Sequence, residues 1–216
     1  MGAYHYAHPE VNNAVDEATF FVSVAGPYLK EGYLRPALDL EEGAGLEGLS
    51  QWVCDWMETV EDLTGVSPIL YTSPSFATEN LNSSVADYDL WIAHWKYDLN
   101  MEPTVPTYWD HWDFWQWSNE SQYAPQGHVP GVEGNAVDLD VFNGSLQDLH
   151  RDFVIPLPGD VDRDRDVDIY DIVRMAGVYG VAQPDPKYDP YCDIDNDGDI
   201  DIYDIVIAAG NYGESW

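Results

Sequence analysis

Short apolar segments alternate with polar ones over the first two thirds of the chain. Six of them are rich in aromatic and β-branched residues and have the length of strands: GAYHYA, PALDLE, PILYTS, LWIAHW, FWQWS and AVDLDVF, which start near residues 2, 36, 68, 90, 114 and 136. Between the second and third segments, apolar residues recur every three or four positions from Leu46 to Leu63, and Gly65 follows. This spacing predicts an amphipathic helix that ends at the glycine, and a second helix is predicted over residues 10–25.

The alternation of strands and helices predicts an α/β fold with a parallel sheet, whose ligand site lies at the carboxyl ends of the strands. Asp39 and Glu41 follow the second predicted strand and lie at such an end. In an extended chain, side chains two residues apart leave the same face, about 6.6 Å apart along the strand. Neighbouring carboxylates oppose each other's ionisation, so one tends to hold its proton, as in a glycosidase pair. The alternative is a solvated loop edge, because 40 acids make such a triplet common by chance.

A repeat occupies the last third of the chain. The segment DVDRDRDVDIYDIVRMAGVYG from Asp160 recurs as DIDNDGDIDIYDIVIAAGNYG from Asp193, a period of 193 − 160 = 33 residues. Such self-similarity indicates one structural unit made twice. The preceding VIPLPGD contains two prolines and a glycine and predicts a linker over residues 155–159. We therefore expect one domain over residues 1–154 and a second over residues 160–216.

Each repeat places acids at the ligand positions of a twelve-residue calcium loop. Positions 1, 3, 5, 9 and 12 are Asp160, Asp162, Asp164, Asp168 and Asp171 in the first repeat, and Asp193, Asp195, Asp197, Asp201 and Asp204 in the second. Position 7, which offers its backbone carbonyl, is Asp166 or Asp199. Position 6 requires a sharp turn and is Gly198 in the second loop but Arg165 in the first, so weaker binding is predicted there. The alternative is an acidic, solvated turn without a metal.

Composition and charge narrow the classes of partner. The chain has 216 residues, 45% of them hydrophobic, and a net charge of −32. This charge excludes nucleic acid and anionic membranes as partners and favours divalent cations, although adaptation to a salty medium would explain part of it. Cys54 and Cys192 are too few for a disulfide framework, and no apolar run is long enough to span a membrane. The start MGAYHYAHP has none of the features of a signal peptide.

The loop-plus-helix unit, duplicated around DPKYDPYCD, resembles the type I dockerin module over residues 160–213. The resemblance implies a small all-α domain with two EF-hand-like loops, two calcium ions, and a cohesin domain of a scaffold protein as partner. In that family the residues before position 12 help to choose the cohesin; here they are Ile169, Tyr170, Ile202 and Tyr203. Because they are apolar where many members are hydroxylic, a different partner class is expected, and the agreement of the two copies allows either face to dock. The alternative is a structural calcium module without a partner.

The six strand-like segments, in this order, resemble the glycoside hydrolase family 25 lysozymes, the N-acetylmuramidases, over residues 2–154. The resemblance implies an incomplete (β/α) TIM-like barrel that lacks its first two strands, so we expect a truncated chain or a misplaced start. It assigns Glu41 as general acid/base, Asp39 as the carboxylate that positions the substrate's N-acetyl group, and Asp138 as a third active-site acid, with Asp140 secondary. It also implies a sugar groove lined by Tyr4, Tyr6, Tyr71, Trp95, Trp115 and Gln116, although some of these side chains could equally fill the core.

The expected function is therefore a muramidase that cleaves the β-1,4 bond after N-acetylmuramic acid in peptidoglycan, without a catalytic cofactor. It would act outside the cell or on its surface, held there by the dockerin. Two alternatives stay open: a catalytically inactive component that binds the wall or another polysaccharide, and a glycosidase that cleaves a different acetylated polymer.

Overall fold

The computed structural model describes residues 1–124 and 127–215, and the chain divides into two compact units. The first, here called the sheet unit, comprises Gly2–Pro27 and Arg35–Ser145. The second, the repeat unit, comprises Met1, Tyr28–Leu34 and Leu146–Trp216.

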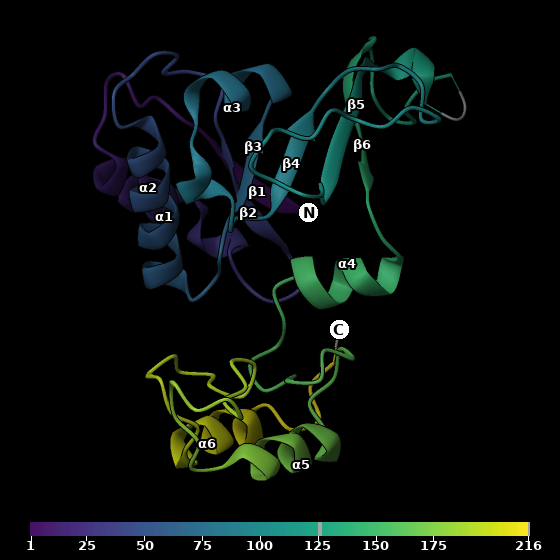
Figure 1. Ribbon diagram of the computed structural model, residues 1–216. Coiled ribbons are helices and arrows are strands. Elements are labelled where there is room, and N and C mark those ends of the chain that lie inside the picture. The colour runs from purple at the N-terminus through teal and green to yellow at the C-terminus, as the bar shows by residue number, and fades with distance from the viewer. Residues whose placement is uncertain (125–126, 216) are drawn as a thin grey trace. The chain divides into compact units, whose positions relative to one another are not determined.

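The sheet unit is built on a curled six-stranded sheet whose strands follow one another in chain order (Figure 1). The strands are β1 (Gly2–Tyr6), β2 (Leu34–Asp39), β3 (Ile69–Thr72), β4 (Leu90–Ala93), β5 (Phe114–Glu120) and β6 (Ala136–Phe142). All six predicted strands are confirmed. The strands from β2 to β5 are parallel, but β6 is antiparallel to β5, which corrects the expectation of a wholly parallel sheet. No α-helix lies between β5 and β6 in the described part of that connection, and parallel neighbours need a crossover that is usually a helix.

Both predicted helices of the sheet unit are present. The α-helices of this unit are α1 (Ala14–Ala25), α2 (Leu49–Thr64) and α3 (Pro74–Asn80), with 3-10 turns at Gly26–Tyr28, Ser83–Val85 and Ser121–Tyr123. Helix α1 begins after Asn13, whose side chain accepts the N–H groups of Val15 and Asp16. Helix α2 ends at Gly65, which has a left-handed φ of 68° that favours glycine. Figure 1 shows α1 and α2 side by side on one side of the sheet.

The hydrophobic core of the sheet unit lies between the sheet and its helices. Fully buried side chains come from the strands and from α2: Leu38, Leu70, Leu90, Ile92, Val53, Trp56, Met57 and Val60. Because successive side chains of a strand alternate between faces, Asp39, Tyr71 and Trp91 project from the opposite face. They lie side by side there, since Asp39 pairs with Tyr71 and Tyr71 with Trp91. The core packing thus determines which residues can form a site on the inner face of the sheet.

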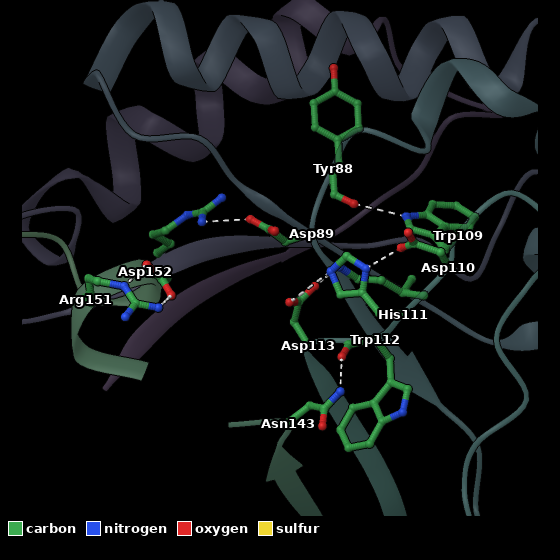
Figure 2. Close-up of polar contacts among 12 residues, drawn as sticks. Tyr88, Asp89, Trp109, Asp110, His111, Trp112, Asp113, Asn143, Arg151 and Asp152 are labelled. Atoms are coloured by element: carbon green, nitrogen blue, oxygen red, sulfur yellow. Dashed lines mark hydrogen bonds and ion pairs between the residues drawn. The ribbon is translucent and has the colours of Figure 1, made fainter. Parts of the chain in front are cut away.

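Polar contacts tie the strands together at the end of the sheet opposite to Asp39 (Figure 2). Asp89 lies just before β4 and forms a 2.7 Å ion pair with Arg35 at the start of β2. Asp113, just before β5, accepts the N–H of Leu90 at 2.9 Å. The side chain of Asn143, just after β6, donates to the carbonyl of Trp112 at 2.9 Å. These contacts hold four strand ends in register.

The repeat unit contains three α-helices among its described residues: α4 (Leu146–Phe153), α5 (Ile169–Val178) and α6 (Ile202–Gly210). Helices α5 and α6 lie side by side (Figure 1). They are the helices expected after the two acidic loops, and each begins with a capping box, made by Asp168 with Asp171 and by Asp201 with Asp204. Their common core is formed by Val161, Met175, Cys192, Ile200 and Ala208.

The two repeats are interlocked by backbone hydrogen bonds. Val167, in the first loop, exchanges hydrogen bonds with residues 213–214, which follow α6: its N–H donates to Glu214 at 3.0 Å, and its carbonyl accepts from Gly213 at 2.8 Å. In the second loop, the N–H of Ile200 donates to the residue 181 carbonyl at 2.9 Å, and its carbonyl accepts from residue 180 at 2.7 Å. Each loop therefore pairs with the segment that follows the other repeat's helix, so the two repeats form one folding unit.

The linker predicted at residues 155–159 lies inside the repeat unit, which already begins at Leu146 on this side of the chain. Pro158 accepts a hydrogen bond from the side chain of Asn211 at 2.9 Å. Gly159 has a φ of 104°, and a Cβ there would lie 2.6 Å from the Cα of Ala208. The close approach of the backbone to α6 explains why glycine occupies this position.

Both cysteines are free and buried. Among the described residues, no helix combines the length and the apolar character that a membrane crossing requires.

Candidate functional site

A hollow of about 170 Å³ lies on the inner face of the sheet unit, and all six strands contribute to it. Its lining residues are Tyr4, Ala37, Asp39, Tyr71, Trp91, Gln116, Asp138 and Asp140. Three carboxyl groups and three aromatic rings therefore meet in one place, although their residues span most of the sheet unit in sequence. Aromatic rings and convergent polar groups are typical of a site for a small polar ligand such as a sugar.

Asp39 is the carboxyl group at the end of β2. Burial raises the pKa of this carboxyl to about 7, and the negative charges of Glu41 and Asp138 add to the rise. Its Oδ1 atom is buried and has no hydrogen-bond partner among the described residues. Asp39 therefore holds a proton at slightly acidic pH, and its Oδ1 atom has an unused capacity to accept a hydrogen bond.

Asp140 is the second acid whose ionisation the hollow opposes. Burial raises the pKa of Asp140 to about 6; the hydrogen bond from Trp91 opposes this, and the charge of Asp138 adds to it. The indole Nε1–H of Trp91 donates to Asp140 Oδ1 at 2.8 Å. Asp138 and Asp140 lie two residues apart on β6, so both project into the hollow.

Glu41, the predicted general acid/base, lies two residues beyond the end of β2 and is exposed. It does not line the hollow itself. Its charge nevertheless contributes to the raised pKa values of Asp39, Tyr71 and Tyr6, so its carboxylate lies near the rim. The structure thus places both predicted acids at the same end of β2, with Asp39 in the lining of the hollow and Glu41 exposed outside it.

Five of the six predicted sugar-contact residues separate into three groups. Tyr4, Tyr71 and Gln116 line the hollow. Trp95 lies beside it, 48% exposed, and its Nε1–H donates to Gln116 Oε1 at 2.7 Å. The Tyr6 hydroxyl is 3.4 Å from the carboxylate of Glu42, outside the lining set.

The prediction that Trp115 lines the groove is wrong. Trp115 is 2% exposed, and its Nε1–H donates to the backbone carbonyl of His94 at 2.8 Å. It is adjacent to Gln116 on β5, and adjacent side chains of a strand point to opposite faces. Since Gln116 faces the hollow, Trp115 belongs to the core.

Two lining residues, Ala37 and Trp91, were missed by sequence reasoning. Ala37 is two residues before Asp39 and therefore shares its face. Trp91 pairs with Tyr71 in the sheet, so the period of two combined with the strand register would have indicated it. The missing information was the register, which depends on how the strands pair.

The acidic loops of the repeat unit form two further clusters. In each loop, the carboxylates of positions 1, 3 and 5 offer oxygen atoms within 4.8 Å of one another: Asp160, Asp162 and Asp164, and Asp193, Asp195 and Asp197. The Oδ1 atom of Asp162 is buried and has no hydrogen-bond partner among the described residues. Hard oxygen ligands gathered in this way fit a calcium ion, which would supply the missing partner.

Position 12 of each loop accepts hydrogen bonds from the backbone of the loop. Asp171 accepts the N–H groups of Val161 and Asp168 at 2.8 and 2.7 Å, and Asp204 makes the equivalent contacts in the second loop. Position 6 has a left-handed φ in both loops, 83° at Arg165 and 96° at Gly198. Arginine is strained in this conformation and glycine is not, so the two loops differ at the position predicted from the sequence.

The four residues predicted to contact a cohesin lie on the first turns of α5 and α6. All of them expose about half or more of their surface: Ile169, Tyr170, Ile202 and Tyr203. They form two equivalent apolar surfaces, one on each helix.

Comparison with known proteins identifies the family of the sheet unit. The model of the glycosyl hydrolases family 25 matches residues 1–126. This match covers more than half of the chain, and the chain therefore belongs to this family.

Relatives and solved structures agree with this assignment. Lysozyme M1 of Streptomyces globisporus is 33% identical over 166 residues, which cover 68% of this chain and 51% of that protein. The N,O-diacetylmuramidase of Chalaropsis sp is 31% identical over 150 residues, which cover 64% of this chain and 69% of that protein. A bacterial lysozyme structure from Streptomyces coelicolor has a TM-score of 0.55 and 29% identity, covering 67% of this chain and 68% of that one. The chain spans about half the length of the first curated relatives that it matches.

Proposed function

We propose that the sheet unit is a muramidase that hydrolyses the β-1,4 bond after N-acetylmuramic acid in peptidoglycan. The observation that carries this proposal is the meeting of Asp39, Asp138 and Asp140 with aromatic rings in one hollow of a family 25 chain. The names of the relatives, a lysozyme and a diacetylmuramidase, support the choice of substrate.

In the proposed reaction, the acetamido carbonyl oxygen of the bound sugar forms a bond to C1 while the glycosidic C1–O bond breaks. Glu41 gives its proton to the leaving oxygen. A water molecule then attacks C1, the bond between C1 and the acetamido oxygen breaks, and the water loses a proton to Glu41, which restores the acid and the acetamido group. Asp39 positions the acetamido group through its buried, unpartnered oxygen, and Asp138 adds a third carboxyl group to the site. No step needs a cofactor.

The repeat unit is proposed to bind two calcium ions and to act as a dockerin. The donor set of each loop fits calcium, with the carboxylates of positions 1, 3, 5, 9 and 12 and the backbone carbonyl of Asp166 or Asp199 as ligands. Bound calcium would neutralise part of the repulsion among these acids. The exposed apolar surfaces at Ile169 and Tyr170 and at Ile202 and Tyr203 would dock to a cohesin domain. A dockerin would hold the enzyme outside the cell or on its surface, near the wall.

A second candidate function is an inactive wall-binding component carried by the repeat unit. The exposed position of Glu41 outside the lining of the hollow favours this alternative. A third candidate is a glycosidase that cleaves a different acetylated polymer, since the strongly anionic chain would be repelled by an anionic wall.

The substitution Glu41→Gln tests the enzyme proposal. It removes the proton donor while keeping the side chain's shape, and general acid catalysis is worth roughly 100-fold to 10,000-fold. We expect release of reducing sugar from purified cell walls to fall by such a factor, with the melting temperature unchanged. Glu47→Gln, an exposed acid in the same connection, makes the same charge change and should leave the rate unaltered. Full activity in Glu41→Gln would refute the assigned role, and sugar binding without turnover in the wild type would favour the second candidate.

A further inference from the structure

The amide of Gln116 has an orientation that its neighbours fix. Gln116 is 5% exposed, and its Oε1 atom accepts two hydrogen bonds, from the Tyr71 hydroxyl at 3.1 Å and from Trp95 Nε1 at 2.7 Å. An indole N–H can only donate, so the amide atom that faces Trp95 must be the oxygen. The usual ambiguity between the oxygen and the nitrogen of a glutamine amide does not arise here.

The Nε2 atom of Gln116 therefore points away from both partners. This nitrogen donates no hydrogen bond among residues 1–124 and 127–215. It is not one of the fully buried atoms that lack a partner in that part of the chain, so part of its surface is accessible. Gln116 also lines the hollow. The side chain thus carries two N–H donors in the wall of the hollow, and neither has an acceptor in the described part of the protein.

A complementary group lies on the same face of the sheet. The Oδ1 atom of Asp39 is buried without a partner among the described residues, and Asp39 pairs in register with Tyr71, the residue that holds Gln116. Apolar surface from Ala37 and Trp91 completes the wall. A buried polar atom without a partner costs free energy, so this arrangement is best satisfied by a ligand that brings an acceptor, a donor and a small apolar group together.

We propose that Gln116 is a specificity-determining residue that recognises the acetamido group of the sugar. Its Nε2–H donates to the acetamido carbonyl, the Asp39 carboxyl accepts from the acetamido N–H, and the methyl group packs against the apolar wall. Tyr71 and Trp95 are positioning residues, because they keep the nitrogen, and not the oxygen, of Gln116 directed at the ligand. This inference rests on the proposed function and deepens it, since it names the residues that select an N-acetylated sugar.

If the N–H of Gln116 recognises the acetamido group, the site should discriminate against sugars that lack this group. A hydroxyl group in place of the acetamido group lacks the carbonyl acceptor and the methyl group, so the Gln116 donor would stay unpaired. Sites built to hydrogen-bond a substrate group reject analogues that lack it, because the protein's own polar group is then left without a partner.

The experiment compares β-1,4-linked trimers of N-acetylglucosamine and of glucose, which are both neutral and differ at C2. Their dissociation constants are measured by titration against the whole chain. We expect the wild type to bind the acetylated trimer at least about tenfold more tightly, and Gln116→Glu to lose most of that preference, because glutamate has the same shape but no N–H to donate.

Trp95→Phe provides a second variant, since Trp95 is half-exposed and the change removes only the donor that orients Gln116. The preference of this variant for the acetylated trimer should fall less than that of Gln116→Glu, because Tyr71 still donates to the amide oxygen. Gln147→Glu, an exposed position on α4, makes the same chemical change away from the hollow and should keep the wild-type preference. A merely structural role of Gln116 would lower the melting temperature without changing the ratio of the two affinities.

Failure of this inference is distinguishable from failure of the proposed function. If the wild type cleaves cell walls but Gln116→Glu keeps the full preference, the role of Gln116 is overturned while the muramidase proposal stands. If the wild type prefers the acetylated trimer through Gln116 but releases no reducing sugar, the role of Gln116 is supported and the muramidase proposal fails. Equal binding of the two trimers by the wild type, or binding of neither, overturns the inference.

Discussion

The hollow of the sheet unit and the loops of the repeat unit both gather carboxyl groups, but by different means. In the loops the acids are two residues apart, and Asp160 accepts the N–H groups of Asp164 and Arg165, each at 3.0 Å. In the hollow, Asp39 and Asp138 come from β2 and β6, and Asp39 Oδ1 has no partner among the described residues.

The difference teaches that the surroundings of a carboxyl group decide its chemistry. Burial raises the pKa of Asp160 to about 6, but two backbone donors oppose the rise by favouring the charged form of the carboxyl, which suits a cation. Asp39 lacks such donors, and burial raises its pKa to about 7, so it suits a ligand that shares a proton or a hydrogen bond. One residue type thus lies in two different electrostatic environments in one chain.

The largest expected effect is the removal of calcium from the repeat unit. At a free calcium concentration 100 to 1,000 times the dissociation constant, each ion contributes about 3 to 4 kcal/mol of stability, which a chelator removes. The far-ultraviolet dichroism signal of the repeat unit should then melt at a lower temperature. Tryptophan fluorescence reports the sheet unit, because eight of the nine tryptophans lie in that unit, and this signal should not respond.

The matched variants for this test are Asp195→Asn within a loop and Asp185→Asn outside both loops. The first should weaken the response to calcium, and the second should leave it intact. A dichroism signal that ignores calcium and chelator alike would contradict the metal assignment.

The next effect concerns the opposite end of the sheet from the hollow. Asp113→Ala leaves the N–H of Leu90 without its acceptor and should destabilise the sheet unit by about 1 to 3 kcal/mol, measured by urea unfolding followed by fluorescence. Activity per folded molecule should not change. Asp110→Ala is the control, since the side chain of Asp110 is 95% exposed and that of Asp113 only 13% exposed. Equal destabilisation by both changes would show that the hydrogen bond to Leu90 contributes nothing.

A smaller effect distinguishes the two loops. Arg165→Gly should relieve a left-handed backbone strain of about 1 kcal/mol and so tighten the first loop's calcium binding about fivefold in calorimetric titration. Gly198→Arg makes the reverse change at the same position of the second loop and should weaken it by a similar factor. The two variants should change calcium affinity in opposite directions; no response from either variant would mean that position 6 does not set affinity.

The smallest effect is the pH dependence that Asp39 imposes on stability. Its pKa is about 7 in the folded protein, whereas an aspartate in an unfolded chain has a pKa of 3.8, so the folded state binds more protons between these limits. The contribution of this group to stability is therefore fully present below pH 3.8 and is lost as the pH rises to 7. Asp39→Asn should remove this loss and raise stability at pH 8 by about 1 kcal/mol, a value discounted for solvent screening.

Urea unfolding at about pH 4.5 and about pH 8, on either side of the folded-state pKa, measures this effect. The variant's stability should differ less between the two pH values than that of the wild type. Asp16→Asn, on an exposed turn of α1, serves as the control. An unchanged pH dependence in Asp39→Asn would mean that the carboxyl group is ionised in the folded protein at neutral pH.

The elements of the fold were predictable where local pattern decides them. Strands such as β3 and β4 are short aromatic or branched segments, and α2 has one apolar stripe and a terminal glycine, so each is specified by its own residues. The direction of β6 was not predictable, because it depends on the path of the connection from β5, whose described residues contain no α-helix.

The candidate site was predictable in its acids but not in all its walls. Asp39 and Asp138 follow from strand ends and from the family's order of segments, and the loop acids from their spacing. The choice between Trp115 and Trp91 depends on which face of each strand meets the helices, and that is known only when the strands are paired. The raised pKa of Asp39 could not be predicted for the same reason, because burial is a property of the folded chain.

The most direct test of the proposed function is the identity of the new reducing ends that the whole chain produces from purified peptidoglycan. Borohydride reduction followed by hydrolysis and mass spectrometry distinguishes the two possible sugar alcohols. Our account predicts the alcohol of muramic acid, formed by the wild type and not by Glu41→Gln. The alcohol of glucosamine, or no new reducing ends at all, would contradict it.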